Sequence, residues 1–127
     1  MSGSVMVHLI FCLRRLPHLS REEFQRYWRE QHAALVKKHA ATLGIKRYVQ
    51  AHTIDPALSQ GIVAARNAPD PYDGVAELWF DITELADRLS NEDARAAGLA
   101  LLEDERRFID LPRSPIFFAD DHVEIGN

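Results

Sequence analysis

The alternation of apolar and polar side chains along this chain predicts four β-strands, because successive side chains of a strand point to opposite faces. The first predicted strand is apolar at nearly every position, which is typical of a strand covered on both faces. The last is centred on the apolar run Ile116 to Phe118. The four predicted strands are residues 5–13, 45–55, 73–81 and 113–125.

A helix is predicted between the first two strands. Ser20 followed by Glu23 forms a capping box, in which the two side chains satisfy free backbone N–H groups at a helix start. From Phe24 onward apolar residues recur at helical spacing, and Gly44 is placed to end the helix.

The second half of the chain gives one further helix and one ambiguous connection. Thr83 and Asn91 are the predicted N-caps of a short helical turn and of a longer helix that runs to about Ile109. Residues 56–72 have an alanine-rich centre that favours a short helix, whereas Gly61 and the later prolines favour a loop. A connection of this length is typical of a functional or mobile loop.

The predicted order is therefore strand, helix, strand, strand, helix, strand. This order predicts an α+β, ferredoxin-like βαββαβ fold, with a four-stranded antiparallel sheet and helices on one face. A length of 127 residues predicts a single domain over residues 1–127.

Helices on one face leave the other face of the sheet uncovered. We expect that uncovered face to be strongly apolar, since it is predicted to carry Met6, Ile10, Val75, Trp79 and Phe117. An apolar surface of this kind usually marks an interface. Two sheets packed face to face about a twofold axis would bury it and enclose a cavity, which predicts a homodimeric α+β barrel.

Composition and charge narrow the possible partners. The chain is 46% hydrophobic and 27% charged, as expected of a soluble globular protein, and no apolar run is long enough to span a membrane. A net charge of −4 argues against binding to nucleic acid. The single Cys12 fits a reducing compartment, and the N-terminal Met-Ser-Gly-Ser lacks the charge of a signal peptide, so we expect a cytoplasmic protein.

The strongest chemical signal is the polar face of the second strand. Tyr48, Gln50 and His52 share that face, and we expect Glu77 and Trp79 of the third strand to line the same layer. His52 is the leading acid–base candidate, because an imidazole titrates near neutral pH. Tyr48 would donate a hydrogen bond to a carbonyl or stabilise an enolate. Glu77 would orient the imidazole, or act as a base if burial raises its pKa. Gln50 would be a polar anchor and Trp79 an apolar wall.

Other histidines and the same network also have structural explanations. His32, one turn after Trp28, is the second catalytic candidate, although a histidine there is more often a packing residue. His8 is predicted to join the inner layer. The polar face of the second strand can equally be a hydrogen-bond network that joins two sheets. The run Glu103 to Glu105 is predicted to be a solvated helix face, with Glu105 able to pair with a nearby arginine.

No metal or cofactor is predicted from motifs. The sequence has no His-Glu-x-x-His, no paired cysteines and no glycine-rich phosphate loop. The site prediction is therefore one without metal. Its catalytic members are His52, His32, Tyr48 and Glu77, and its substrate-binding members are Gln50, Trp79, His8 and Trp28.

Four segments together resemble the EthD family: LSREEFQRYWREQHAALV, RYVQAH, YDGVAELWFD and EDERRFID. The resemblance implies a dimeric α+β barrel built from ferredoxin-like subunits. Relatives occur beside oxidoreductases of xenobiotic breakdown and in aromatic polyketide pathways, so the family is often labelled oxidoreductase. The positions that match its recurrent residues are Trp28, His32, Tyr48, Gln50, His52, Asp73, Gly74, Glu77, Trp79, Phe108 and Asp110.

Three hypotheses follow. The first is a cofactor-independent enzyme acting on a small hydrophobic, oxygenated or ring compound by proton transfer, as in isomerisation, cyclisation or dehydration; oxidation of a quinol-like substrate by oxygen is a variant. The second is a non-catalytic ligand-binding or accessory protein for a partner oxygenase, contacted through residues 56–72. The third is a dimer whose polar layer only sets the register of the two sheets.

Overall fold

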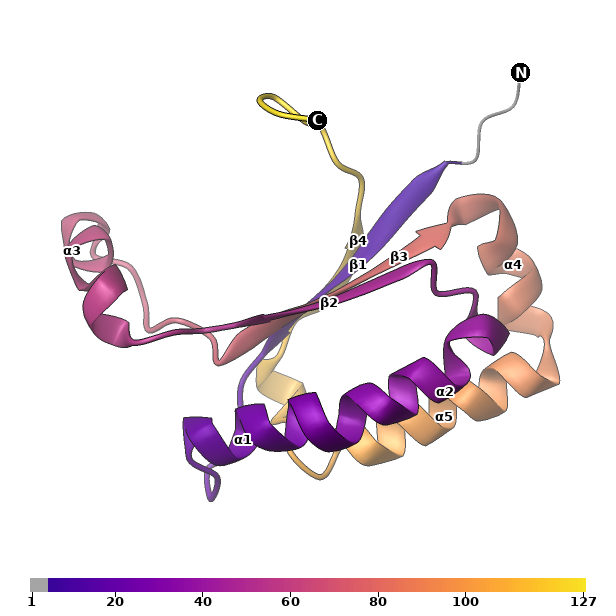
Figure 1. The fold of residues 1–127 in the computed structure, drawn as a ribbon, viewed down its shortest axis with the longest axis horizontal. Helices are drawn as coiled ribbons and strands as arrows, with labels where there is room; N and C mark the ends of the chain where they lie inside the picture. Colours follow the sequence, from indigo (N-terminus) through magenta and orange to yellow (C-terminus); the bar gives the residue numbers. More distant parts are fainter. Residues whose placement is uncertain (1–4) are drawn as a thin grey trace.

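The computed structural model describes residues 5–127, and the N-terminal Met-Ser-Gly-Ser, where we found no signal-peptide charge, lies outside the described residues. The fold is α+β and ferredoxin-like, as predicted (Figure 1). Its single sheet has the strand order β2-β3-β1-β4, and every neighbouring pair is antiparallel. The strands are β1 (Met6–Leu13), β2 (Arg47–His52), β3 (Gly74–Asp81) and β4 (Ile116–Ala119).

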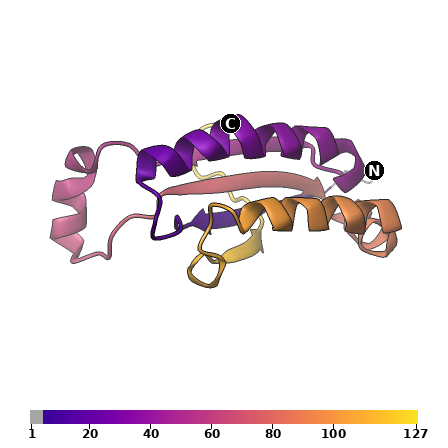
Figure 2. The same cartoon turned by 90° about the horizontal axis from the view of Figure 1, so that it is seen from below.

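The main helices cover one face of this sheet and run beside each other beneath it (Figure 2). The capping box is confirmed: the Glu23 N–H donates to the Ser20 hydroxyl at 3.0 Å, and the Ser20 N–H donates to the Glu23 carboxylate at 2.9 Å. Gly44 ends this helical run in the left-handed conformation, with φ 76°. The covering elements are α1 (Arg21–Tyr27), a π-helical segment (Trp28–His32), α2 (Ala33–Leu43) and α5 (Glu92–Glu105).

The hydrophobic core lies between the sheet and these helices. The odd positions of β1 point into it, including Phe11 and Leu13, and the even positions face the uncovered side. The largest fully buried side chains are Trp28, Phe24, Phe108 and Leu13. Among the described residues, no helix has both the length and the apolar character needed to cross a membrane.

Several predicted boundaries differ from the structure. α4 (Ile82–Ser90) begins after Asp81, whose carboxylate accepts the Thr83 N–H at 2.8 Å, so Thr83 is not the cap. Asn91 does cap α5, accepting the Ala94 N–H at 3.0 Å. α5 ends at Glu105 rather than near Ile109, because the chain then turns and a short 3-10 helix (Leu111–Arg113) follows. β2 and β4 are both shorter than predicted, because only their central residues find a neighbouring strand.

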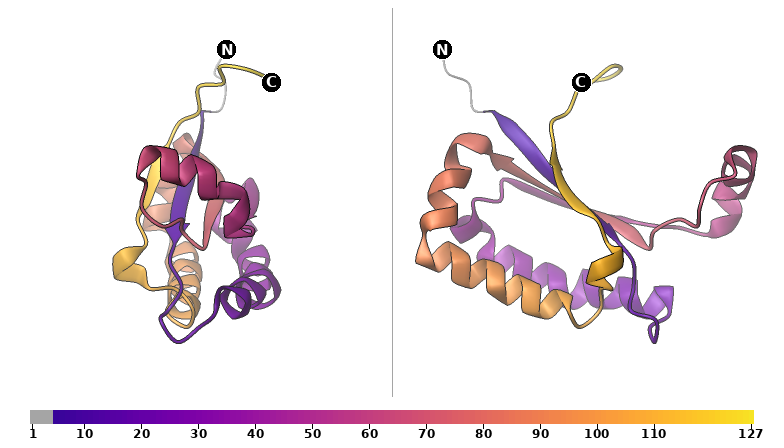
Figure 3. Two further views of the ribbon diagram at one scale, coloured as in Figure 1. Left: turned by 90° about the vertical axis from the view of Figure 1, so that its left-hand side faces the viewer. Right: turned by 180° about the vertical axis from the view of Figure 1, so that it is seen from behind.

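The ambiguous connection between β2 and β3 is a helix followed by a loop. α3 (Pro56–Arg66) has 11 residues and none of them is buried. It stands away from the sheet and from the other helices (Figure 3). Asp55 caps it by accepting the Ala57 N–H at 2.9 Å. The short-helix alternative is therefore confirmed, and the rest of the connection is loop.

Gly74, at the start of β3, is a point of close approach between the helical layer and the sheet. A Cβ at this position would lie 2.8 Å from Trp28 Cη2 and 2.9 Å from the Ala51 carbonyl oxygen. The indole ring of Trp28 therefore rests directly on the glycine backbone. The Trp28 ring is held by its burial and the Ala51 carbonyl by the sheet, so neither can move aside easily.

Gly74→Ala is expected to lower the free energy of unfolding by about 2 kcal/mol or more, because the added methyl overpacks a filled contact. Urea denaturation measures the change. The control is Gly61→Ala in α3, where no heavy atom lies within 4 Å of the new Cβ. The free energy of unfolding of this control variant should rise by up to about 1 kcal/mol, because alanine has a higher helix propensity than glycine. Equal losses in both variants would contradict the close contact.

Candidate active site

The strand register decides which face carries the polar row of β2. Tyr48 pairs with Leu78 and Gln50 pairs with Ala76, and paired residues of an antiparallel sheet point to the same side. Leu78 and Ala76 lie in the core beneath the helices. Tyr48, Gln50 and His52 therefore face the helices, and the prediction that they look out from the uncovered face is wrong.

These polar groups find their partners on the helical layer and on one another. The Gln50 amide donates to the Trp28 carbonyl oxygen at 3.0 Å and to the Tyr48 hydroxyl at 2.7 Å. Its own oxygen then accepts from His52 Nε2 at 2.7 Å. The His52 ring stacks on Trp28, with ring centroids 4.4 Å apart. Alternation along a strand shows which side chains share a face, but it does not show which layer covers that face.

Three other predicted site residues, His8, Glu77 and Trp79, lie on the opposite, uncovered face. His8 is there, as predicted, and stacks on Trp79 with centroids 4.5 Å apart. Its Nε2 is 3.4 Å from Glu77 Oε1 and its Nδ1 is 3.1 Å from Asp121 Oδ1. Glu77 and Trp79 therefore surround His8 and do not orient His52, because the sheet separates them from it.

His32 is held inward by the π-helical segment of the first helical run. The Ala33 N–H donates to the Trp28 carbonyl oxygen, five residues earlier, instead of to the residue four positions back. Such a widened turn is frequently found at functional sites. Both ends of the segment are buried, since the exposed fractions of Trp28 and His32 are 1% and 5%. His32 is thus held inside the helical layer.

A cavity of about 230 Å³ lies between the sheet and helices α2 and α5. Its wall is mostly aliphatic and aromatic, with Phe11, Leu78 and Leu101 among the residues that form it. Of the predicted site residues, only His32, Tyr48 and Trp28 line it. Within residues 5–127, no three His, Cys, Asp or Glu side chains converge as metal ligands would.

An aspartate at the end of α5 fixes the orientation of His32. Asp104 Oδ2 lies 2.7 Å from His32 Nδ1, and Asp104 Oδ1 accepts the Tyr27 hydroxyl at 2.5 Å. An ionised carboxylate only accepts, so Nδ1 carries the proton and Nε2 keeps its lone pair. Burial lowers the pKa of His32, although Asp104 opposes this, so the imidazole is neutral at neutral pH. His32 Nε2 lies 4.0 Å from Glu105 Oε2.

Glu105 is the third polar group of the cavity wall. Burial, together with the charge of Asp104, raises the pKa of Glu105 to about 7. Burial also raises the pKa of the Tyr48 phenol, and the Glu105 charge adds to this against the hydrogen bond from Gln50. At neutral pH the cavity thus presents a neutral phenol, a neutral imidazole and a carboxyl group near its midpoint. Such a set can give and take protons.

The prediction of a solvated acidic run is wrong for Asp104 and Glu105, whose side chains are only 15% and 19% exposed. A signal for this was present in the sequence. The buried face of α5 carries Ala94, Ala97 and Leu101, and the same helical spacing leads next to residues 104 and 105. Glu105 is a candidate site residue that the sequence reasoning missed.

Comparison with known proteins gives a family and a fold. The EthD domain model matches residues 16–112. No curated protein matches the sequence. An EthD family protein from Bacillus halodurans is 16% identical, with 93% of this chain and 100% of that chain covered and a TM-score of 0.59.

Two other solved structures are similar to the same extent. An EthD-like protein from Ralstonia eutropha is 15% identical, with 97% of each chain covered and a TM-score of 0.55. A dimeric protein of unknown function with a ferredoxin-like fold, from Bacteroides fragilis, is 11% identical, with 91% of this chain and 96% of that chain covered and a TM-score of 0.56. At these identities the likeness shows the fold alone.

The raised pKa of Glu105 predicts a specific pH dependence of stability. With a pKa near 7 in place of the ordinary 4.5, the folded protein binds more protons than the unfolded chain between these values. The contribution of Glu105 to the free energy of unfolding should therefore fall as pH rises through this window. Glu105→Gln has no carboxyl group to titrate there. From the acidic to the neutral end of the window, its free energy of unfolding should therefore rise by up to about 3 kcal/mol relative to that of wild type.

Urea denaturation at stepped pH measures this difference. Glu103→Gln, an exposed neighbour on the same helix, is the control and should follow the wild-type curve. Parallel curves for wild type and Glu105→Gln would show that Glu105 does not titrate in this window.

Proposed function

This chain belongs to the EthD domain family, and we propose that it is a small cofactor-independent enzyme that moves protons on a hydrophobic, oxygenated ring compound. The observation that carries the proposal is the convergence of Glu105, His32 and Tyr48 on one largely apolar cavity. Groups with proton affinities near neutral pH are costly to bury, and they concentrate at catalytic sites. The proposed site lies inside one subunit, not between two.

The geometry supports an enolisation step. Tyr48 accepts its hydrogen bond from Gln50, so its own proton is free to be donated to a substrate carbonyl oxygen. Glu105, whose Oε2 lies 4.0 Å from His32 Nε2, would remove a proton from the neighbouring carbon, and Tyr48 would stabilise the enolate. The proton then returns at another position or leaves with a hydroxyl. Isomerisation, cyclisation and dehydration share this step.

The cavity wall also limits the substrate class. As formed by the described residues, it contains no arginine and no lysine, so nothing in it would pair with a substrate anion. Its apolar residues favour a ring system, and its three polar groups favour one or two oxygen atoms. Together these features support a neutral, oxygenated ring compound of the kind met in xenobiotic degradation or polyketide-type metabolism.

One observation favours the second candidate function, a non-catalytic or accessory role beside a partner oxygenase. α3 stands apart from the body and exposes Leu58 and Ile62, one helical turn apart, at 72% and 61%. Exposed apolar residues on a projecting helix are typical of contact with another protein. In that case the cavity would bind its ligand without converting it.

The two functions are separated by adding the neutral ring ketone 1-tetralone in D2O. Binding of 1-tetralone is expected to raise the Tm of the wild-type protein. The wild-type protein should also speed the exchange of the protons beside the carbonyl for deuterium, which NMR follows. Glu105→Gln should keep the rise in Tm and lose at least about a hundredfold in exchange rate. Binding without exchange would favour the accessory function.

A cavity-filling variant provides the matched control. No heavy atom lies within 4 Å of a Cβ built on Gly98, which lines the cavity from α5. Gly98→Leu should therefore fold at least as stably as wild type, while its side chain occupies the ligand space. Unchanged binding and exchange in this variant would place the site elsewhere.

We also propose that two copies pair through their uncovered sheet faces. Met6 and Phe117 are 39% and 48% exposed there, beside the His8–Trp79 stack. The similar Bacteroides fragilis protein is described as dimeric, which supports the proposal. The interface would then contain the polar cluster of His8 and Glu77, which sets the register of the two sheets.

Phe117→Lys should shift the mass measured by analytical ultracentrifugation from dimer to monomer, because two buried ammonium groups would face an apolar surface. Leu89→Lys is the control, since Leu89 is 74% exposed on α4 and α4 lies on the helix side of the molecule. The Phe117→Lys monomer should still bind 1-tetralone, because the cavity is formed within one chain. A dimer that persists in the Phe117→Lys variant would contradict this interface.

A further inference from the structure

A second cavity, of about 410 Å³, opens at the end of the sheet where β1 finishes and β3 begins. Four arginines and two aspartates line it, although the whole chain has a net charge of −4. The charged residues of its wall are Arg14, Arg15, Arg21, Arg113, Asp70 and Asp73. None of these residues lines the cavity beneath the helices.

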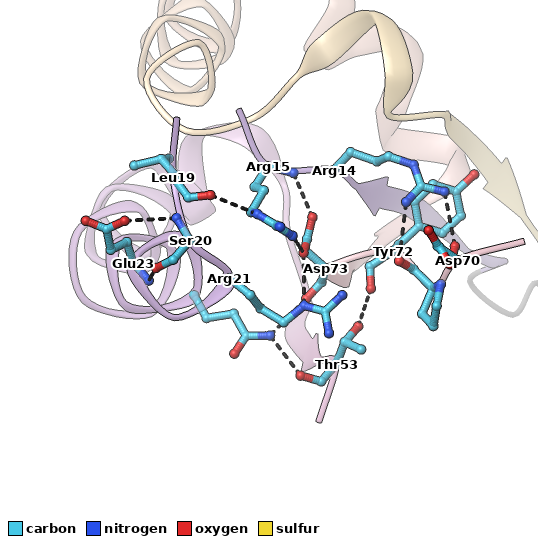
Figure 4. A network of polar contacts seen from close by, with 12 residues as sticks. Arg14, Arg15, Leu19, Ser20, Arg21, Glu23, Thr53, Asp70, Tyr72 and Asp73 are labelled. Atoms are coloured by element: carbon cyan, nitrogen blue, oxygen red, sulfur yellow. Dashed lines mark hydrogen bonds and ion pairs between the residues drawn. The ribbon is translucent and has the colours of Figure 1, made fainter. Parts of the chain in front are cut away.

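Asp73 organises the floor of this second cavity (Figure 4). Its side chain is only 4% exposed and accepts from the Arg15 backbone N–H at 2.8 Å, from the Arg15 guanidinium, and from Arg21 Nε at 3.0 Å. Burial alone would raise the pKa of Asp73, but these hydrogen bonds outweigh it and hold the pKa below its usual value. Two guanidinium groups are thereby fixed in position by one buried carboxylate.

Both guanidinium groups keep donors that the described residues do not use. Arg21 donates to Asp73 through Nε alone, which leaves both of its Nη groups without a partner in residues 5–127. Arg15 donates from Nε to the Leu19 carbonyl oxygen and from Nη1 to Asp73, so its Nη2 has no hydrogen-bond partner in residues 5–127. The side chains are 27% and 38% exposed, so these donors are accessible from the cavity.

The remaining two arginines, Arg14 and Arg113, add two positive charges to the wall, against the carboxylates of Asp70 and Asp110. Arg14 donates to the carbonyl oxygens of Pro71 and Asp70, both at 3.3 Å, and stacks on the Tyr72 ring at 4.2 Å. Backbone carbonyls orient this guanidinium but carry no net charge. Arg113 is 65% exposed, and its nearest carboxylate, Asp110, lies 3.7 Å away. Even with Asp110 counted, positive charge remains in excess.

We propose that this cavity is an anion site that binds the phosphate group of a small molecule. Guanidinium groups present paired N–H donors that match the oxygens of a phosphate, and pre-fixed donors lose little freedom on binding. The two arginines that share Asp73 supply the fixed donors and the excess positive charge, and Arg14 and Arg113 add further guanidinium donors. The volume admits a phosphate together with an organic group. The proposal is independent of the function assigned to the apolar cavity.

The test is calorimetric titration of the intact protein with inorganic phosphate and with phenyl phosphate, at about pH 8 where both are dianionic. Sodium chloride keeps the ionic strength constant. Wild type should bind one equivalent saturably. Tighter binding of phenyl phosphate would identify an ester as the ligand, and equal binding would identify free phosphate; both results support the proposal.

Two variants locate the binding. Arg113→Gln removes one positive charge from the cavity wall. Arg21→Lys keeps a positive charge beside Asp73 but loses the paired N–H donors of the guanidinium. Each should weaken phosphate binding about tenfold. Arg26→Gln is the matched control, because Arg26 is 59% exposed and lies 3.6 Å from Glu22, much as Arg113 lies near Asp110. It should bind like wild type.

Two results would overturn the proposal. One is the absence of saturable heat up to about 20 mM phosphate. The other is an affinity that is the same in Arg113→Gln and Arg26→Gln. Arg113 is exposed, so its replacement should not impair folding, and this comparison stands even if Arg21→Lys is unstable.

Discussion

The contact between Trp28 and Gly74 sets the distance between the two layers of this protein. The indole lies on the bare backbone of β3, so at this end of the sheet the helical layer cannot come closer and has no space to fill. Farther along, the facing positions are small, as at Ala76 and Gly98, and the layers leave a cavity between them. A tight contact at one end and small residues beyond it thus leave a pocket between the layers.

Two carboxylates beside the cavity are largely buried, which costs free energy unless hydrogen bonds compensate. Tyr27 and His32 each form a hydrogen bond with Asp104, so both of its carboxylate oxygens have partners close to the core. Glu105 has no such partner among the described residues, so burial raises its pKa to about 7. Of these two neighbouring carboxylates, only Asp104 is hydrogen-bonded by the described residues, and its charge adds to the effect of burial on Glu105.

The sheet gives its two faces different environments for similar residues. His52 and His8 are both stacked on a tryptophan, yet one lies beneath the helices and the other on the uncovered side. At the end of the sheet, Asp73 joins the start of β3 to the loop after β1 and to α1 through two arginines. The same ion-pair network that closes the fold at this end also leaves the unused arginine donors of the second cavity.

Local sequence patterns were sufficient for the ferredoxin-like order of strands and helices, the caps at Ser20, Gly44 and Asn91, and the sharing of one face by Tyr48, Gln50 and His52. These features depend on neighbours within a few residues. The layer that covers that face, the proton affinity of Glu105 and the gathering of four arginines are properties of the tertiary structure alone. Alternation is unchanged when the two faces of a strand are exchanged, and burial and charge are set by segments that are distant in the sequence.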